Sequence, residues 1–156
     1  MKKYAFLLAG LIGFLASCNT AGINEQHVAI PEHAWKSSYI PSFSFTVADT
    51  VSAYRVFIVI RHTDAYRYKN LWVKIGAQVP GDSLVSDSRN LILATDDKGW
   101  LGEGMDDLYE HRILLNQQPA YFRKKGTYTY TLQHLMREDP LEYIMNVGVR
   151  IEKVQE

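Results

Sequence analysis

The chain has 156 residues, of which 17 are basic and 17 are acidic, so its formal net charge is zero. This balance argues against a nucleic-acid-binding protein, which would concentrate basic residues on one surface. The single cysteine, Cys18, excludes a disulfide framework and a thiolate metal cluster. With 47% apolar residues, the chain is long enough for one domain with a sizeable core and too short for two comfortable ones.

The first eighteen residues have the three parts of a lipoprotein signal peptide. Two lysines at residues 2–3 precede an apolar run at residues 5–15 (AFLLAGLIGFL), and small residues at 16–17 lead to Cys18. The apolar run is far shorter than the roughly 20 residues that span a bilayer as a helix. We therefore predict a signal peptide at residues 1–17 that is cleaved; the alternative is an ordinary signal peptide or a buried helix that ends at a chance cysteine.

The chemistry expected at Cys18 is lipidation. Its thiol takes a diacylglyceryl group as a thioether, and the amine freed by cleavage can receive a further fatty acyl chain such as palmitate. Two or three chains hold a protein on a membrane, whereas one chain binds only marginally. We predict that residues 18–26 form a lipid-anchored tether and that residues 27–156 form one domain. Removal of Lys2 and Lys3 with the signal peptide leaves a mature chain of 15 basic and 17 acidic residues, a net charge near −2.

Short alternating segments predict the fold. Residues 42–47 place Phe43, Phe45 and Val47 on one face, and residues 127–132 alternate threonine with apolar or aromatic residues, as half-buried strands do. Further strands are expected at residues 54–61, apolar on both faces and hence central, and at 71–75, 89–94 and 143–151; residues 105–115 suit a short helix or a strand.

These segments make about seven or eight short strands with turns between them and no long helical period. The sequence therefore predicts an all-β fold, an antiparallel β-sandwich of jelly-roll or immunoglobulin-like type. We expect the segments at residues 54–61 and 71–75 to pair as a hairpin whose long tip is residues 63–70.

No catalytic or metal-binding pattern emerges. The five histidines lack the paired spacing of a metal site, and the serines at 83, 86 and 88 lack a nucleophile elbow. Two acidic pairs, at residues 96–97 and 106–107, would hold calcium only if their loops converged, and the ordered oxygen-ligand pattern is absent. We expect no enzyme activity, no cofactor and no metal, and interpret the acidic pairs as turn residues.

The three tryptophans suggest a different class of function. Exposed aromatic rings on β-sandwich modules stack against sugar rings, so Trp35, Trp72 and Trp100 make a carbohydrate-binding lipoprotein the alternative. Trp72 alternates with core residues of its strand, and we expect it to be packed rather than free.

Two segments resemble a known family. RHTDAYRYKNLWVKI (residues 61–75) and LATDDKGWLGEGMDDLYEHR (residues 93–112) are similar to the GldH family of gliding-motility lipoproteins of the Bacteroidetes, although Thr95 stands where the family has an acidic residue. The matching positions are Arg61, Tyr66, Tyr68, Asn70, Leu71, Trp72, Leu93, Ala94, Gly99, Trp100, Leu101, Gly102, Gly104, Asp107 and Tyr109, with Gly126, Tyr128, Met136, Arg137, Leu141, Val147, Gly148 and Arg150 near the end.

The resemblance implies a cellular role rather than a reaction. It implies an envelope lipoprotein needed for gliding, a non-enzymatic accessory or interaction component of the motility and secretion machinery that binds other envelope proteins. In this lineage an acidic cluster after the lipidated cysteine resembles a surface-export signal. Its absence after Cys18 favours an outer-membrane protein that faces the periplasm.

The expected interaction surface is formed by the two loops richest in tyrosine, arginine and acid, at residues 63–70 and 99–112. Binding residues concentrate on loops held by a rigid scaffold, and tyrosine and arginine are enriched at interface hot spots. The competing interpretation is that the aromatic members cap the core. The candidate residues are Tyr66, Arg67, Tyr68, Trp100, Asp106, Asp107, Tyr109 and Arg112.

Overall fold

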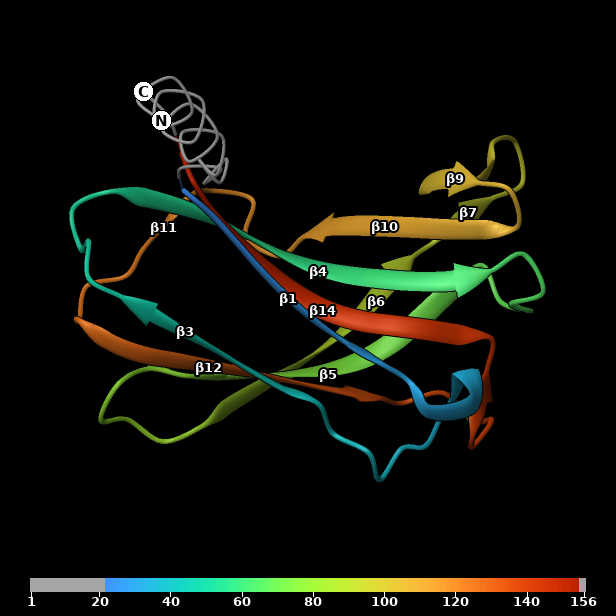
Figure 1. Ribbon diagram of the computed structural model, residues 1–156, viewed down its shortest axis with the longest axis horizontal. Helices are drawn as coiled ribbons and strands as arrows, with labels where there is room; N and C mark the ends of the chain where they lie inside the picture. Colours follow the sequence, from blue (N-terminus) through green and yellow to red (C-terminus); the bar gives the residue numbers. More distant parts are fainter. Residues whose placement is uncertain (1–21, 155–156) are drawn as a thin grey trace, which may run out of the picture.

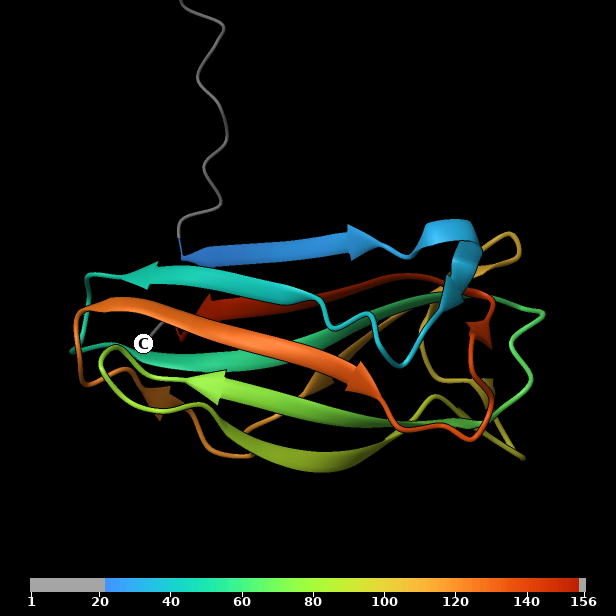
Figure 2. The same cartoon turned by 90° about the horizontal axis from the view of Figure 1, so that it is seen from below.

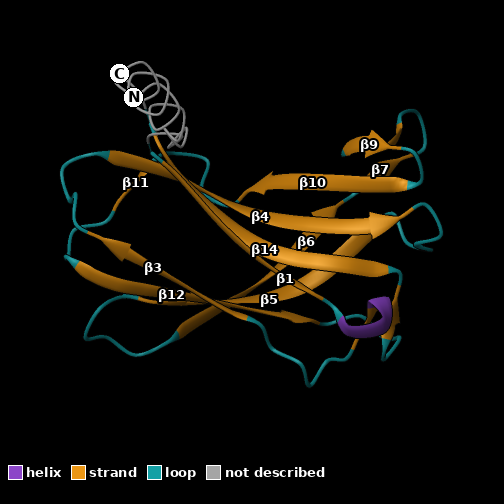
Figure 3. Ribbon diagram, viewed as in Figure 1, coloured by secondary structure: helices purple, strands orange, loops and turns teal. Residues whose placement is uncertain are grey.

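The computed structural model describes residues 22–154, which fold as an antiparallel β-sandwich (Figures 1 and 3). The predicted signal peptide at residues 1–17, Cys18 and the first part of the tether lie outside the described residues. Within residues 22–154 no helix is long and apolar enough to cross a membrane. The all-β prediction is confirmed.

One layer is a six-stranded sheet. Along it the strands are ordered β1-β14-β4-β10-β9, and β11 also pairs with β4. All of its pairings are antiparallel. The bounds are β1 Ile23–Ala29, β4 Ala53–Thr63, β9 Glu103–Met105, β10 Leu108–Leu114, β11 Ala120–Tyr121 and β14 Ile144–Lys153.

The other layer has four strands in the order β3-β12-β5-β6, which lie side by side in Figure 2. Two short ladders, β13 with β2 and β7 with β8, and the 3-10 helix η2 complete the described chain. The bounds are β3 Ser42–Val47, β5 Asn70–Gln78, β6 Val85–Ile92, β12 Gly126–His134, β2 Ala34–Trp35, β13 Leu141–Glu142, β7 Ala94–Thr95, β8 Gly99–Trp100 and η2 Pro31–His33.

The core lies between the layers because each sheet turns an apolar face inward. In β3 every second residue is buried, starting at Phe43, and in β12 the buried residues alternate with threonines as predicted. Successive side chains of a strand point to opposite faces, so this period of two separates core from solvent. The six-stranded sheet contributes Ile58, Ile60 and Val149, all with no exposed surface.

The prediction that β4 is central is confirmed, but the expected hairpin is wrong. β4 is paired on both sides, by β14 and by β10, and its middle residues Ile58, Val59 and Ile60 are buried although they point alternately to the two faces. β5 pairs instead with β12 and β6 in the other layer. Residues 64–69 therefore cross from one sheet to the other. The segment at residues 105–115 forms mainly β10, a strand rather than a helix.

The described domain begins earlier in the chain than the expected boundary at residue 27. β1 starts at Ile23 and pairs with β14 along its whole length, so residues 23–26 of the expected tether are part of the sheet. In the sequence, only residues 19–22 separate Cys18 from β1.

Trp72 is exposed, although the sequence analysis expects it to be packed. Its neighbours Leu71 and Val73 face the core, and the same alternation turns Trp72 to the outer face of the four-stranded sheet, where its exposed fraction is 45%. Trp35, in contrast, is fully buried, and its indole donates a hydrogen bond to the carbonyl of Tyr39 at 2.9 Å.

The sandwich has two ends with different loops. We call the end where β1 begins the proximal end; it comprises residues 48–52, 79–84, 115–125 and 153–154. The opposite end, where β4 finishes, is the distal end. It comprises residues 64–69, 96–107 and 135–143 (Figure 1, left and right). The 11 residues of β4 connect the two ends, and at about 3.3 Å per residue they separate them by roughly 35 Å.

Candidate functional site

The distal end brings together both predicted loops. β10 pairs with β4 so that Leu108 lies opposite Thr63, and β9 continues the sheet beside β10. The backbone of Asp64 donates to the carbonyl of Asp107 at 2.8 Å, which joins the two loops directly. The strand register therefore makes neighbours of predicted surface residues that are about 40 positions apart in the sequence.

A cluster of five rings forms the base of this end. We call His62, Tyr66, Trp100, Tyr109 and His111 the ring cluster. His62 is central: its ring centroid lies 4.4 Å from that of Trp100, 5.2 Å from Tyr66, 5.8 Å from Tyr109 and 5.0 Å from His111. Ring pairs at such distances contribute about 0.5–1.5 kcal/mol beyond their buried area.

The two histidines are buried and hydrogen-bonded to each other. The Nε2 atoms of His62 and His111 are 2.9 Å apart, and the Nδ1 atom of His62 lies 2.7 Å from the carbonyl oxygen of Thr63. A carbonyl only accepts, so His62 carries its proton on Nδ1, and its Nε2 accepts from the Nε2–H of His111. Burial lowers the pKa of His111 to about 4 and also lowers that of His62, so both rings are neutral at pH 7.

This pair was missed from the sequence. The histidines stand 49 residues apart and show no local spacing, so only the β4–β10 register brings them together. Within residues 22–154 no group of three His, Cys, Asp or Glu side chains is placed to hold a metal ion. The acidic pairs at 96–97 and 106–107 are exposed, and Asp96 forms an ion pair with Lys69.

The glycines of the GWLGEG motif allow β10 and the segment before it to approach closely. A Cβ at Gly102 would lie 2.5 Å from the carbonyl oxygen of Glu110 and 2.9 Å from Cε1 of His111. No side chain fits there unless the backbone shifts. Gly102 therefore lets residues 99–105 close over the ring cluster.

Arg67 and Tyr68 join the β4–β5 loop to the segment around β13. The guanidinium of Arg67 pairs with Glu142, lies 3.7 Å from Glu138 and sits over the ring of Tyr143 at 5.6 Å. The hydroxyl of Tyr68 donates to Glu138 at 2.8 Å, and this hydrogen bond raises the pKa of Tyr68. Both side chains are thus held in place by partners distant in the sequence.

The structure places the eight predicted surface residues in two layers. Tyr66 is buried, with 3% of its surface exposed, and its hydroxyl donates to the carbonyl of Asn70 at 3.0 Å; Trp100, Tyr109 and Tyr68 are half-buried. Arg67, Asp106, Asp107 and Arg112 are exposed. Arg112 is on β10 and pairs with Glu110 at 2.5 Å. The exposed layer therefore rests on the ring cluster.

The distal end is acidic. Its three segments contain nine acidic and four basic residues, a net charge of −5, while the whole chain is neutral. The acids come from all three segments rather than from one run. They are Asp64, Asp96, Asp97, Glu103, Asp106, Asp107, Glu138, Asp139 and Glu142, against Arg67, Lys69, Lys98 and Arg137.

The sequence profile of the GldH lipoprotein family matches residues 22–151, which is nearly all of the described sandwich. The chain belongs to the GldH lipoprotein family. The resemblance seen in the two motif segments is thereby confirmed, and the matched residues include the segments that form the distal end.

Two similar proteins carry the family name. A "gliding motility lipoprotein GldH homolog" of Christiangramia forsetii is 28% identical over 95% of this chain and 94% of its own length. The "gliding motility lipoprotein GldH" of Flavobacterium johnsoniae is 25% identical over 98% of both chains. The similarity therefore extends over full lengths rather than over one motif.

Among solved structures, a carbohydrate-binding module specific for non-crystalline cellulose (CBM28) matches with a TM-score of 0.44 and 14% identity, covering 84% of this chain and 73% of the module. With a TM-score below 0.5, this likeness identifies no shared ligand.

Proposed function

We propose that this protein is an envelope lipoprotein of gliding motility that works as a non-enzymatic interaction component, binding another envelope protein through its distal end. Its family and the names of two relatives support the gliding role. The observation that carries the interaction role is the distal end itself, an acidic exposed layer resting on a buried, hydrogen-bonded ring cluster.

The rigidity of this end suits binding. Arg67 and Tyr68 already have their partners in the free protein, and the loop that carries Asp106 is hydrogen-bonded through Asp107 to Asp64. Side chains that are ordered before binding lose less conformational entropy on association. With a net charge of −5, the distal end fits a basic surface on its partner, and opposite charge also speeds encounter.

We place the protein on the outer membrane, facing the periplasm and attached through Cys18. The lipobox and the absence of an acidic cluster after Cys18 support this location. Fractionation of native membranes, combined with protease treatment of intact cells, tests it: a protein digested in intact cells would face the outside instead.

The interaction role is tested by Arg67→Ala combined with Asp106→Ala. Both side chains are exposed, and an exposed ion pair is worth only about 0–1 kcal/mol, so the melting temperature should change little. Gliding and co-purification of the partner with the native lipoprotein should both fall.

The matched control is Asp87→Ala combined with Arg89→Ala. These residues form an exposed ion pair of 2.8 Å on β6, outside the distal end, and their removal also deletes one acid and one base. The control should glide normally. Normal gliding of the distal variant, or its loss together with unfolding, would contradict the assignment.

A second candidate function, carbohydrate binding, is favoured by the exposure of Trp72. Its ring lies on the outer face of the four-stranded sheet, in register with Asn90 and two residues from Lys74. Asn70 donates to Asn90 at 2.7 Å, so amide groups flank the ring. An indole face beside amides matches a sugar, which has an apolar C–H face and hydroxyls at its rim.

Retention of the protein by immobilised cell-wall and capsular polysaccharides tests this candidate. Trp72→Ala should abolish retention, whereas Tyr39→Ala, which removes another ring of similar exposure (41%), should not. If neither the native protein nor the variants are retained by any polysaccharide, carbohydrate binding is rejected and the protein-binding proposal is unaffected.

A further inference from the structure

The folded chain begins at the proximal end, very close to the predicted anchor. Gly22 is the first described residue, and its carbonyl accepts a hydrogen bond from the backbone of Lys153 at 2.7 Å. Four peptide steps separate Cys18 from Gly22, and even fully extended they reach only about 14 Å. A lipid on Cys18 therefore keeps Gly22, and with it the part of the proximal end around Lys153, within about that distance of the membrane surface.

The proximal end is basic. Residues 48–52, 79–84, 115–125 and 153–154 contain four basic and two acidic residues, a net charge of +2, opposite in sign to the distal end. Both acids have partners: Asp49 accepts from Lys153 at 2.7 Å, and Asp82 accepts from Lys124 at 2.8 Å.

Two cations of this end stay exposed and unpaired. No ion pair within residues 22–154 involves Arg123 or Lys125, which flank Lys124 in the segment before β12. Hydrogen bonds from Lys153 and Ser52 hold the pKa of Asp49 well below its usual range, so Asp49 stays charged and keeps Lys153 engaged. The free positive charge of the proximal end thus comes from Arg123 and Lys125.

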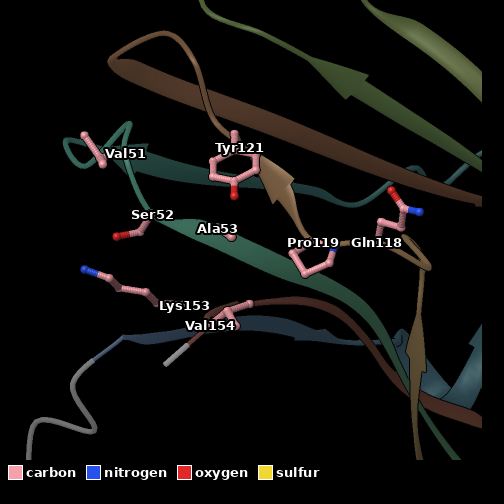
Figure 4. Close-up of a pocket in the computed structure, with 8 residues that line it drawn as sticks. All are labelled: Val51, Ser52, Ala53, Gln118, Pro119, Tyr121, Lys153 and Val154. Atoms are coloured by element: carbon pink, nitrogen blue, oxygen red, sulfur yellow. The ribbon is translucent and has the colours of Figure 1, made fainter. Parts of the chain in front are cut away.

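Apolar side chains are exposed beside these cations. Val51 is 85% exposed and Tyr121 is 57% exposed, and both line an open hollow of about 780 Å³ together with Ser52, Pro119 and Lys153 (Figure 4). Figure 4 shows Lys153 and Val154 beside the point where the chain leaves the described domain. Tyrosine is enriched at the level of lipid headgroups because its ring is apolar and its hydroxyl is polar.

We propose that the proximal end docks on an anionic phospholipid surface, with Arg123 and Lys125 at the headgroups and Val51 and Tyr121 at the interface. Juxtamembrane basic residues are attracted to anionic lipids within a Debye length of about 10 Å, and a tether that reaches at most about 14 Å lets the proximal end come within that range. The same surface would repel the acidic distal end in the opposite orientation. In the docked orientation the distal end points away, about 35 Å out by the length of β4.

The test uses the full-length lipidated protein reconstituted in vesicles of phosphatidylcholine and phosphatidylglycerol that carry a quencher on the headgroups. The thioether blocks Cys18, so Val51→Cys or Met105→Cys supplies the only free thiol for a fluorescent label. Both positions are highly exposed, Met105 on the distal strand β9. The label at position 51 should be strongly quenched and shifted to the blue, and the label at 105 should behave as in water. Equal quenching at both positions, or stronger quenching at 105, overturns the proposal.

The electrostatic part is tested by Arg123→Ser combined with Lys125→Ser. Quenching at position 51 should fall in each of three separate cases: in this variant, when the vesicles are pure phosphatidylcholine, and when the native sequence around position 51 is measured at high salt. The matched control is Lys98→Ser with Arg137→Ser, which removes two exposed cations from the distal end and should leave quenching at 51 unchanged. Melting curves of each variant confirm that it is folded. Quenching at 51 that is independent of lipid charge and of these cations overturns the headgroup role assigned to Arg123 and Lys125.

Discussion

The two ends of the sandwich are built in opposite ways. The distal end is cross-linked: rings pack around His62, the two buried histidines share a hydrogen bond, and Arg67 bridges to Glu142. The proximal end is open, with Val51 and Tyr121 exposed around a hollow. Their net charges are −5 and +2. One end is pre-ordered, as specific recognition requires, and the other offers exposed apolar and basic groups next to the start of the folded chain.

The difference follows from how each end offsets the conformational entropy that its loops lose when they become ordered. Long loops cross the distal end, and ring stacking and hydrogen bonds there offset part of the entropy that these loops lose on ordering. The proximal loops are also hydrogen-bonded, through Asp49 and Asn116. Their ring contacts are fewer, with Phe122 packed on Tyr54 and Tyr128. A lipid surface needs no unique geometry. Changes at the two ends of the sandwich should therefore differ in their effects.

Replacing Cys18 by Ala should remove the lipid from the proximal end completely, because no other residue supplies a thiol. Labelling with radioactive fatty acid should be abolished, and the protein should accumulate as precursor or be released, with gliding lost. Ser17→Ala keeps a small residue before the cysteine and should label normally. Fatty-acid uptake by the Cys18→Ala protein would refute the lipobox.

Replacing one glycine by alanine at each end should show how tightly that end is packed. Gly102→Ala forces a Cβ to within 2.5 Å of a backbone carbonyl, and such overpacking costs about 3 kcal/mol of unfolding free energy. Gly81→Ala at the proximal end meets nothing within 4 Å and pays only for its φ of +81°, about 1 kcal/mol. Urea titrations measure both values. Equal losses would show that the distal end is no more tightly packed.

Stability should fall as the pH drops from about 6.5 toward 4, because of the distal histidines. The pKa of His111 is lowered to about 4, so in this window the unfolded chain binds a proton that the folded protein does not. Asp49 at the proximal end has a lowered pKa instead, and its contribution is lost only below about 3.8. Melting temperatures across pH 3–8 should show a shallower slope between 6.5 and 4 for His111→Gln; an unchanged slope would remove the histidine pair as its cause.

The smallest expected difference in unfolding free energy comes from removing one hydroxyl group at each end. Tyr68→Phe removes the hydrogen bond to Glu138 and should lower the unfolding free energy slightly. Tyr121→Phe removes an exposed hydroxyl that has no hydrogen-bond partner within residues 22–154, and the unfolding free energy should not change. Chemical denaturation of both variants measures the difference. A comparable loss in Tyr121→Phe would mean that the proximal ring is more constrained than its exposure indicates.

The sequence was sufficient where structure depends on neighbours along the chain. The period of two in β3 and β12, the apolar middle of β4 and the all-β class could be predicted, because alternation of side chains is a property of a single extended strand. The same rule, applied to Trp72 beside Leu71 and Val73, would have placed its ring outside the core; we expected packing instead, and the strand turned it outward. The motif residues also sufficed to identify the family.

Only the tertiary structure decided which strands pair and which loops meet. No local signal distinguishes a β4–β5 hairpin from a crossing between sheets, since both need the same two strands and a polar connection. The pairing of His62 with His111 depends on a β4–β10 register that spans 49 residues. The predicted surface residues could be named from their types, but the burial of Tyr66 and the exposure of Asp106 depend on how three distant segments close over one another, because burial is set by the packing of all neighbours in space.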